Sequence, residues 1–130
     1  MRVYSRVEGR ELATPMTQTD PRSLLPLTEV AFEILLSLSD GERHGYDILK
    51  DIERRTDGRL RLHPGTLYRA LARMIDDGLV EQTVADGDVD QRRRPMRMTR
   101  LGGEVAKAES ARLAALVGQA RARRWLRKPV

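Results

Sequence analysis

Apolar side chains recur at helical spacing in the first part of this chain, and polar residues fill the positions between them. One stretch begins at Thr28, whose hydroxyl suits a helix N-cap, and ends near Gly41. The next covers residues 45–56. The pattern predicts a solvent side for this second helix that comprises Lys50, Asp51, Glu53, Arg54 and Arg55. The predicted buried positions of both helices are Val30, Ile34, Leu35, Leu38, Tyr46, Ile48, Leu49 and Ile52.

A third helix and a hairpin follow. The helix begins at Pro64, because proline lacks the N–H that would stay unpaired in a first turn, and it ends at Gly78. Residues 79–84 and 94–98 read as two strands, with a polar turn between them, which predicts a β-hairpin. The predicted core positions of the helix are Leu67, Leu71, Met74 and Ile75.

The C-terminal part of the chain, residues 99–125, predicts one long helix with a moderate apolar stripe. Arg112 and Gly118 interrupt this stripe. A small domain buries a limited fraction of its surface, so pairing of the stripe with a second copy of the chain would add burial. The predicted dimer interface comprises Val105, Ala108, Leu113, Leu116, Val117 and Ala120.

The order of three helices, a hairpin and a long helix predicts a mainly α fold: a winged helix-turn-helix with a β-hairpin wing and a long C-terminal helix. Residues 1–26 have little periodicity and several prolines, so they read as an N-terminal extension that is loosely attached or flexible. Residues 27–98 form the predicted DNA-binding domain. Residues 99–130 form the predicted dimerisation helix with a basic tail.

Composition narrows the class of protein. The chain has 130 residues, of which 40% are hydrophobic and 4% aromatic, and its formal net charge is +5. Its basic residues are mainly arginine, which suits a polyanionic partner, although arginine also tracks genomic GC content. There is no cysteine, which excludes disulfides and thiolate metal sites and fits the cytoplasm. We expect no membrane segment, because no apolar run approaches the roughly 20 residues that one needs.

The third helix carries the main candidates for DNA contact. Gly65 and Thr66 lie at its start, where free N–H groups attract phosphate; simple helix capping is the alternative. Arg69 and Arg73 are four residues apart and share a face away from the core, where the alternative is solvation alone. The Tyr68 hydroxyl either contacts a phosphate or packs under the second helix. In the hairpin and elsewhere, the predicted contacts are Arg92, Arg93 and Arg94, with Lys50, Arg61 and His63 as weaker candidates.

Residue types for other chemistry are sparse. His44 and His63 are the only histidines, and without nearby cysteines they do not predict a metal site. The aspartates at residues 86, 88 and 90 lack the order and the closing glutamate of a calcium loop. There is no Ser-His-Asp set and no glycine-rich phosphate loop. We therefore expect neither a cofactor nor an enzymatic activity.

The motifs, taken in order, resemble the PadR family of transcriptional regulators. That family's pattern is close to HGYEI, GTLYPAL-x-RL, EGLI, a basic wing and LT-x-x-G, and Gly102 occupies the position of the last glycine. The resemblance spans about residues 27–102 and implies the short subgroup with one C-terminal helix. The matching segments are HGYDI at residues 44–48, PGTLYRALARM at 64–74, DGLV at 77–80, and RRR at 92–94 followed by MT at 98–99.

The chain departs from the family pattern at two places. Pro95-Met96 replaces a tyrosine pair in the returning wing strand, and proline has no N–H, so we expect a shorter or bulged pairing. Arg69 takes a position that is often proline, which adds a charge to the third helix. Trp125 lies far along the last helix, where packing against the extension or a partner subunit is the favoured interpretation.

These observations predict a homodimeric, sequence-specific DNA-binding regulator, with a ligand-responsive repressor as the favoured form. Two third helices would lie roughly 34 Å apart on a palindromic operator of double-stranded DNA. The resemblance implies a small aromatic effector of the phenolic or drug-like kind. The alternative is a winged-helix module that binds another protein, with arginines that only increase solubility.

Overall fold

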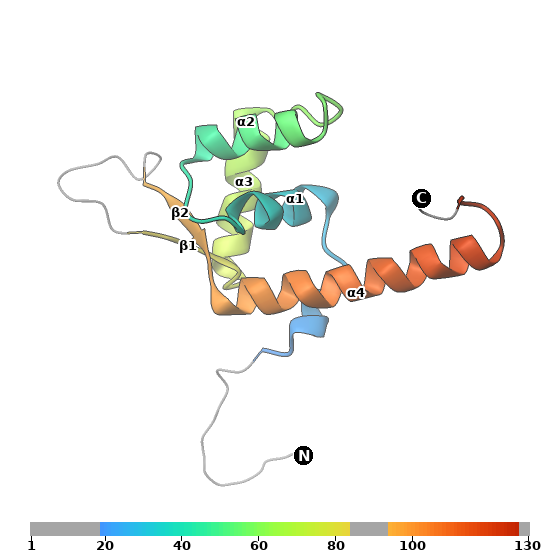
Figure 1. Cartoon of the computed structure of the whole chain (residues 1–130). Helices are drawn as coiled ribbons and strands as arrows, with labels where there is room; N and C mark the ends of the chain where they lie inside the picture. The colour runs from blue at the N-terminus through green and yellow to red at the C-terminus, as the bar shows by residue number, and fades with distance from the viewer. Residues whose placement is uncertain (1–18, 84–93, 128–130) are drawn as a thin grey trace, which may run out of the picture.

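The computed structural model describes residues 19–83 and 94–127. After a short 3-10 helix, η1 (Pro21–Leu24), come three helices, α1 (Glu29–Leu38), α2 (Gly45–Arg55) and α3 (Pro64–Asp76). The strands β1 (Val80–Gln82) and β2 (Met96–Met98) and the long helix α4 (Arg100–Ala122) complete the described part (Figure 1). The predicted order of elements and the mainly α winged-helix fold are therefore confirmed.

Hydroxyl caps begin two of the helices. The Thr28 Oγ1 atom accepts a hydrogen bond of 3.0 Å from the Ala31 N–H, which confirms the predicted start of α1. The Thr99 Oγ1 atom does the same for the Gly102 N–H at 3.0 Å. Each bond satisfies one of the N–H groups that a helix start leaves without a partner. Helix α3 begins at Pro64, as predicted.

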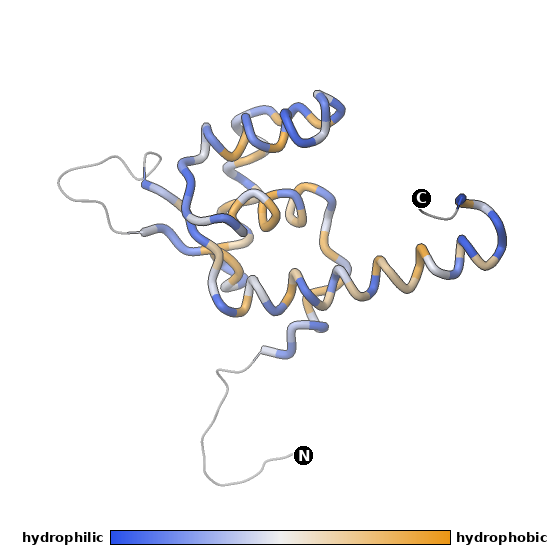
Figure 2. Tube along the Cα trace, viewed as in Figure 1, coloured by the Kyte–Doolittle hydropathy of each residue, from blue (hydrophilic) through white to orange (hydrophobic). Residues whose placement is uncertain are grey.

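The core is aliphatic and receives side chains from α1, α2, α3, both strands and the start of α4. Figure 2 shows the hydrophobic positions of these elements turned toward one another. Two residues predicted to be buried lie outside this core: Tyr46 is 63% exposed and Ile75 is 36% exposed. Both sit at the margin of an apolar stripe, where periodicity alone does not define the edge of a buried face.

Asp51 corrects the prediction for α2, because it is buried rather than solvated. Its carboxylate accepts hydrogen bonds from Arg54 and, at 2.8 Å, from Arg55 Nε, and Arg55 Nη1 reaches Glu33 Oε1 on α1 at 2.6 Å. Burial by itself would raise the pKa of the Asp51 carboxyl. The hydrogen bond from Arg55 and the charges of Arg55 and Arg43 outweigh burial and hold this pKa below its ordinary value of 3.8.

The wing is anchored to the loop before α2. Strands β1 and β2 pair antiparallel, with Val80 opposite Met98. Met96 also exchanges two backbone hydrogen bonds with Arg43, of 2.8 and 3.0 Å. The strands are shorter than predicted: β2 begins only after Pro95, which has no N–H to donate. The tip of the predicted hairpin lies outside the described residues.

The N-terminal extension needs a partial correction. Residues 1–18 lie outside the described part, but the following segment packs on the domain, with η1 against α4. Leu24, Leu25 and Leu27 are partly buried against the core. These leucines make the boundary between extension and domain earlier than the predicted residue 27.

Helix α4 has two different halves. Val105 is fully buried in the domain core, so its predicted place in a dimer interface is wrong. Beyond Glu109, none of the described residues is buried, and the helix extends away from the domain (Figure 1). Trp125, near its end, is 75% exposed and does not pack on the described extension.

Candidate nucleic-acid interface

Helix α3 presents a polar, cationic face opposite its buried face. Leu67, Leu71 and Met74 are buried, whereas Arg69 and Arg73 are exposed. Arg73 Nε lies 3.6 Å from the Asp77 carboxylate. Arg69 has no carboxylate partner among the described residues; its Nη2 atom reaches only the Thr66 hydroxyl, at 3.4 Å. Arg69 is thus a guanidinium charge on α3 that is free to meet an anion.

The first turn of α3 is also open. The N-cap residue His63 makes no side-chain capping hydrogen bond. The N–H groups of Gly65 and Thr66 have no hydrogen-bond acceptor within the described ranges. Gly65 is exposed, and Thr66 is half-buried. Unpaired amides at the positive end of a helix dipole attract phosphate, so this turn has the geometry that the sequence predicted.

Tyr68 packs against α2. A Cβ atom added at Gly45 would lie 2.6 Å from the Tyr68 hydroxyl oxygen and 3.0 Å from its ring carbon Cζ. The ring therefore lies directly on the backbone of the first turn of α2. Of the two interpretations left open for Tyr68, the structure shows packing; a phosphate contact stays a prediction.

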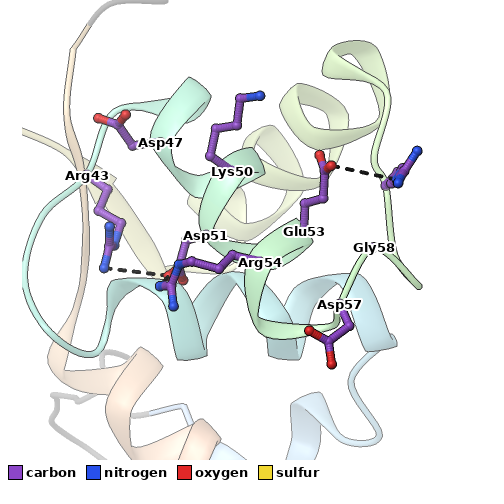
Figure 3. Close-up of a pocket in the computed structure, with 9 residues that line it drawn as sticks. Arg43, Asp47, Lys50, Asp51, Glu53, Arg54, Asp57 and Gly58 are labelled. Carbon is purple, nitrogen blue, oxygen red and sulfur yellow. Dashed lines mark hydrogen bonds and ion pairs between the residues drawn. The ribbon is translucent and has the colours of Figure 1, made fainter.

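Two of the three weaker candidates lie in a hollow of about 680 Å³ whose lining charges balance (Figure 3). Lys50 and Arg61 line it, and Arg61 Nε is 3.6 Å from the Glu53 carboxylate. An anion gains less here than at Arg69, because carboxylates already offset the cations. The cationic residues that line the hollow are Arg43, Lys50, Arg54 and Arg61, and the acidic residues are Asp47, Asp51, Glu53 and Asp57.

The exposed Tyr46 beside Lys50 was missed by the sequence reasoning. The Lys50 Nζ atom lies 5.3 Å from the centroid of the Tyr46 ring. At this distance the ring face attracts the ammonium group and orients it. The pair adds an exposed aromatic hydroxyl to the surface of α2. Its signal in the sequence was the placement of Tyr46 at the edge of the apolar stripe.

In the wing, only part of the predicted arginine run can be placed. Arg92 and Arg93 lie outside the described residues. Arg94 is half-buried, and its Nε atom is buried without a hydrogen-bond partner in the described part of the chain. Arg97, which the sequence reasoning did not select, is exposed on β2 but donates to Glu81 at 2.7 Å. Its charge is therefore already paired.

A groove of about 440 Å³ follows one flank of α3. Thr66, Arg69 and Arg73 form one wall, and the segment from Leu24 to Thr28 contributes to the other. Periodicity could not reveal this groove, because the segment before α1 has none. The packed N-terminal segment therefore lies next to the exposed, cationic face of α3.

Other kinds of site find little support. The described residues contain no group of three His, Cys, Asp or Glu side chains that could hold a metal ion. Within the same ranges, no helix combines the length and the apolarity required to cross a bilayer.

Comparison with known proteins identifies the family. A model of the transcriptional regulator PadR-like family matches residues 34–108. A relative from Streptomyces fradiae, the uncharacterized 37.1 kDa protein in transposon TN4556, is 40% identical over 86 residues. That alignment covers 66% of this chain but only 23% of the relative, so the chain spans less than a quarter of that protein.

Solved structures agree with this assignment. A transcriptional regulator from Clostridium thermocellum is 27% identical, with a TM-score of 0.62 over 71% of this chain and 86% of that one. A PadR family transcription regulator from Clostridium difficile R20291 is 21% identical, with a TM-score of 0.60 over 72% and 96% of the two chains. Bacillus subtilis PadR, solved in complex with operator DNA, is 17% identical, with a TM-score of 0.51 over 78% and 49%. At such low identities the last two show the fold alone.

The family model covers more than half of the chain, and the resemblance predicted from the sequence motifs is confirmed. The family consists of transcription regulators and not of enzymes, in agreement with the prediction that this chain has no catalytic activity. The chain belongs to the PadR-like family of transcriptional regulators.

Proposed function

We propose that this regulator binds double-stranded DNA sequence-specifically in the cytoplasm, as a homodimer on a palindromic operator. Helix α3 enters the major groove, and the wing reaches the adjacent backbone or minor groove. The observation that carries this proposal is the exposed face of α3, where Arg69 has no carboxylate partner within the described ranges. The α2 hollow, by contrast, is balanced in charge.

Each part of this surface has a distinct role in the proposal. The open amides of Gly65 and Thr66 bind a phosphate and orient the start of α3. Arg69 and Arg73 reach base edges, since arginine can pair with guanine in a bidentate manner. Lys50, Tyr68 and Arg94 contribute backbone contacts at the margins. The same proposal assigns backbone contacts to Arg61 and His63, and wing contacts to Arg92 and Arg93.

Dimerisation is proposed through the exposed half of α4. Leu116 is 49% exposed, and Leu113 and Val117 are each 36% exposed, on a helix that extends beyond the domain. Val105 and Leu116 are eleven residues apart, three helical turns, so they share one face. The stripe that enters the core at Val105 thus continues uncovered past the domain. Ala108 and Ala120 are partly buried and flank this surface.

Repression and its release by a small aromatic effector are the finer part of the proposal. They are supported by the family resemblance rather than by a particular cavity. An effector that binds better to a dimer with altered spacing of the two α3 helices would lower the population that fits the operator. Binding to DNA and binding to such an effector would then oppose each other.

The proposal is tested by fluorescence anisotropy on labelled DNA from upstream of the chain's own gene, against scrambled DNA, over a salt series. We expect preferential binding that weakens steeply with salt, because phosphate contacts release counterions. Arg69→Ala should weaken binding to the preferred DNA by about five- to hundredfold, the range for one base contact.

Arg22→Ala is the matched control. Arg22 is an exposed arginine on η1 that lies 3.6 Å from Asp20 and outside the proposed surface. It removes the same charge, so an equal loss in both variants would mean a nonspecific charge effect. Absence of DNA binding even at low salt would reject the proposal and favour the module that binds another protein.

A further inference from the structure

Glu109 is a buried carboxylate in α4 with three hydrogen bonds. It is 2% exposed. Its Oε2 atom accepts the Leu27 N–H at 3.0 Å and Arg112 Nη2 at 3.0 Å, and its Oε1 atom accepts Arg112 Nε at 2.5 Å. The hydrogen bond from Arg112 is the main cause that holds the pKa of Glu109 below its ordinary value, against the opposing effect of burial. The carboxylate is therefore ionised at neutral pH.

The position of Glu109 along α4 is what gives it a role. Gly102 and Val105, in the preceding turns, are buried against the domain, and no described residue after Glu109 is buried. Glu109 is thus the last buried contact before the helix leaves the domain. Its partner Leu27 directly precedes Thr28, the N-cap of α1. The contact therefore fastens the emerging helix to the start of α1.

The contact between Glu109 and Leu27 also lies next to α3, the helix proposed to enter the major groove. Leu27 lines the groove whose other wall contains Arg69 and Arg73. The Glu109 side chain therefore connects α4 to the N-terminal segment that packs beside α3. Arg112, which interrupts the apolar stripe in the sequence, serves this contact rather than weakening the helix.

We propose that Glu109 is a positioning residue: by binding the Leu27 N–H, it sets the direction of α4 relative to α3, and so the spacing between the two half-sites that a dimer recognises. This inference rests on the proposed function. From Glu109 to the end of α4 the helix rises about 20 Å, so a swing of about 10° displaces its end by about 3.5 Å. That displacement is close to one base-pair step, about 3.4 Å.

The test uses the full-length protein and a half-site selected from random-sequence DNA. Affinity is measured for one half-site, and for inverted pairs of half-sites whose spacing changes by one base pair at a time. The variants are Glu109→Ala, which removes all three acceptor interactions, and Glu109→Gln, which keeps the shape and one carbonyl acceptor. Glu104→Ala is the control, because it removes the same charge from an exposed position on α4.

We expect the wild type and Glu104→Ala to prefer one spacing by about tenfold over spacings two base pairs away. Glu109→Ala should lose most of this preference or shift its optimum by a base pair. Its affinity for a single half-site should stay within about twofold of wild type, and Glu109→Gln should be intermediate. Circular dichroism melts of every variant show whether the domain remains folded at the assay temperature.

Three results would overturn the inference. The first is an unchanged spacing profile in Glu109→Ala. The second is a parallel loss of half-site binding and folding in both Glu109 variants, which would mean that the contact only stabilises the domain. The third is a wild type that binds DNA but does not discriminate spacing, which would reject this inference alone. Failure of the wild type to bind any DNA would instead reject the proposed function, and it is recognised without any variant.

Discussion

At Gly102 the first turn of α4 meets the backbone at the base of the wing. A Cβ atom there would lie 2.2 Å from the Leu79 carbonyl oxygen and 2.9 Å from Met98 Cγ. Backbone cannot move aside as a flexible side chain can, so only glycine allows this approach. The family pattern LT-x-x-G includes this glycine, and the structure supplies the physical reason for it: α4 packs too closely on the base of the hairpin to leave room for a side chain.

Gly102→Ala should therefore lower the free energy of unfolding by about 2–3 kcal/mol, in the upper range for overpacking. Gly103→Ala is the matched control, because a Cβ there meets only Met98 Cε, at an ordinary 3.7 Å. Alanine favours a helix interior over glycine by up to about 1 kcal/mol, so the control should be neutral or stabilising. Urea unfolding followed by circular dichroism measures both; equal destabilisation would contradict the argument.

The buried Asp51 makes a prediction about acid stability. Burial raises the pKa of the Asp51 carboxyl, but the hydrogen bond from Arg55 and the charges of Arg55 and Arg43 together outweigh burial and lower this pKa in the folded state. The unfolded chain therefore takes up the proton first as the pH falls. The stabilising contribution of Asp51 is fully present above about pH 4, the unfolded value, and is lost as the pH falls toward the folded pKa.

Between about pH 5 and pH 3, the free energy of unfolding of the wild type should fall more steeply than that of Asp51→Asn. Glu109 also has a lowered pKa, so Asp51→Asn should retain part of the slope. Asp47→Asn, which removes an exposed carboxylate from the same helix, is the matched control. Parallel pH profiles for the wild type and Asp51→Asn would show that the network around Asp51 does not contribute as described.

At the scale of elements, α2 and α3 pack closely because one of them has no side chain at the contact. The Tyr68 ring occupies the space that a side chain at Gly45 would need. This contact places the first turn of α2 and the face of α3 in a fixed relation. The helix that carries Arg69 is therefore packed directly against α2.

Gly45→Ala should cost about 1–3 kcal/mol of stability in the wild type, since the tyrosine ring must move. In a Tyr68→Ala background the same substitution should cost little, because the ring is gone. The double-mutant cycle measured by chemical unfolding thus gives a coupling energy between the two positions. Additive effects would show that the ring does not constrain Gly45.

At the scale of the molecule, α4 extends beyond the domain that it helps to bury. The exposed leucines of its second half lie on the face that is buried in its first half. Such a surface on a small, modestly hydrophobic domain favours association. This arrangement is consistent with the proposed homodimer, in which paired α4 helices would hold the two α3 helices at a defined distance.

Leu116→Arg should shift the protein toward monomer, because it places a charge in the proposed apolar interface. Sedimentation analysis over a range of concentrations measures this shift. Ala115→Arg is the control: Ala115 is exposed and lies on the opposite side of α4 from the leucine stripe. A dimer unaffected by Leu116→Arg, or equally weakened by both variants, would place the interface elsewhere.

The sequence by itself determined the order of the elements, because helical spacing, caps and breakers are local properties of the chain. Thr28, Pro64 and Gly78 marked boundaries that the structure confirms. The motifs also determined the family. The cationic residues of α3 could be selected in the same way, since one face of that helix was plainly apolar.

Only the tertiary structure decided which residues each side chain contacts and which side chains are buried. Val105 and Leu116 belong to the same apolar stripe of α4, yet Val105 is in the core while Leu116 is exposed, because the domain ends between them. Asp51 was predicted to be solvated and Glu109 was not singled out in the sequence, yet both are buried and accept hydrogen bonds from arginines. Leu27 meets Glu109 across 82 positions of sequence separation, a contact that no local pattern encodes. Periodicity predicts which face of a helix a side chain occupies, but only the packing of the whole chain determines which residues lie against that face.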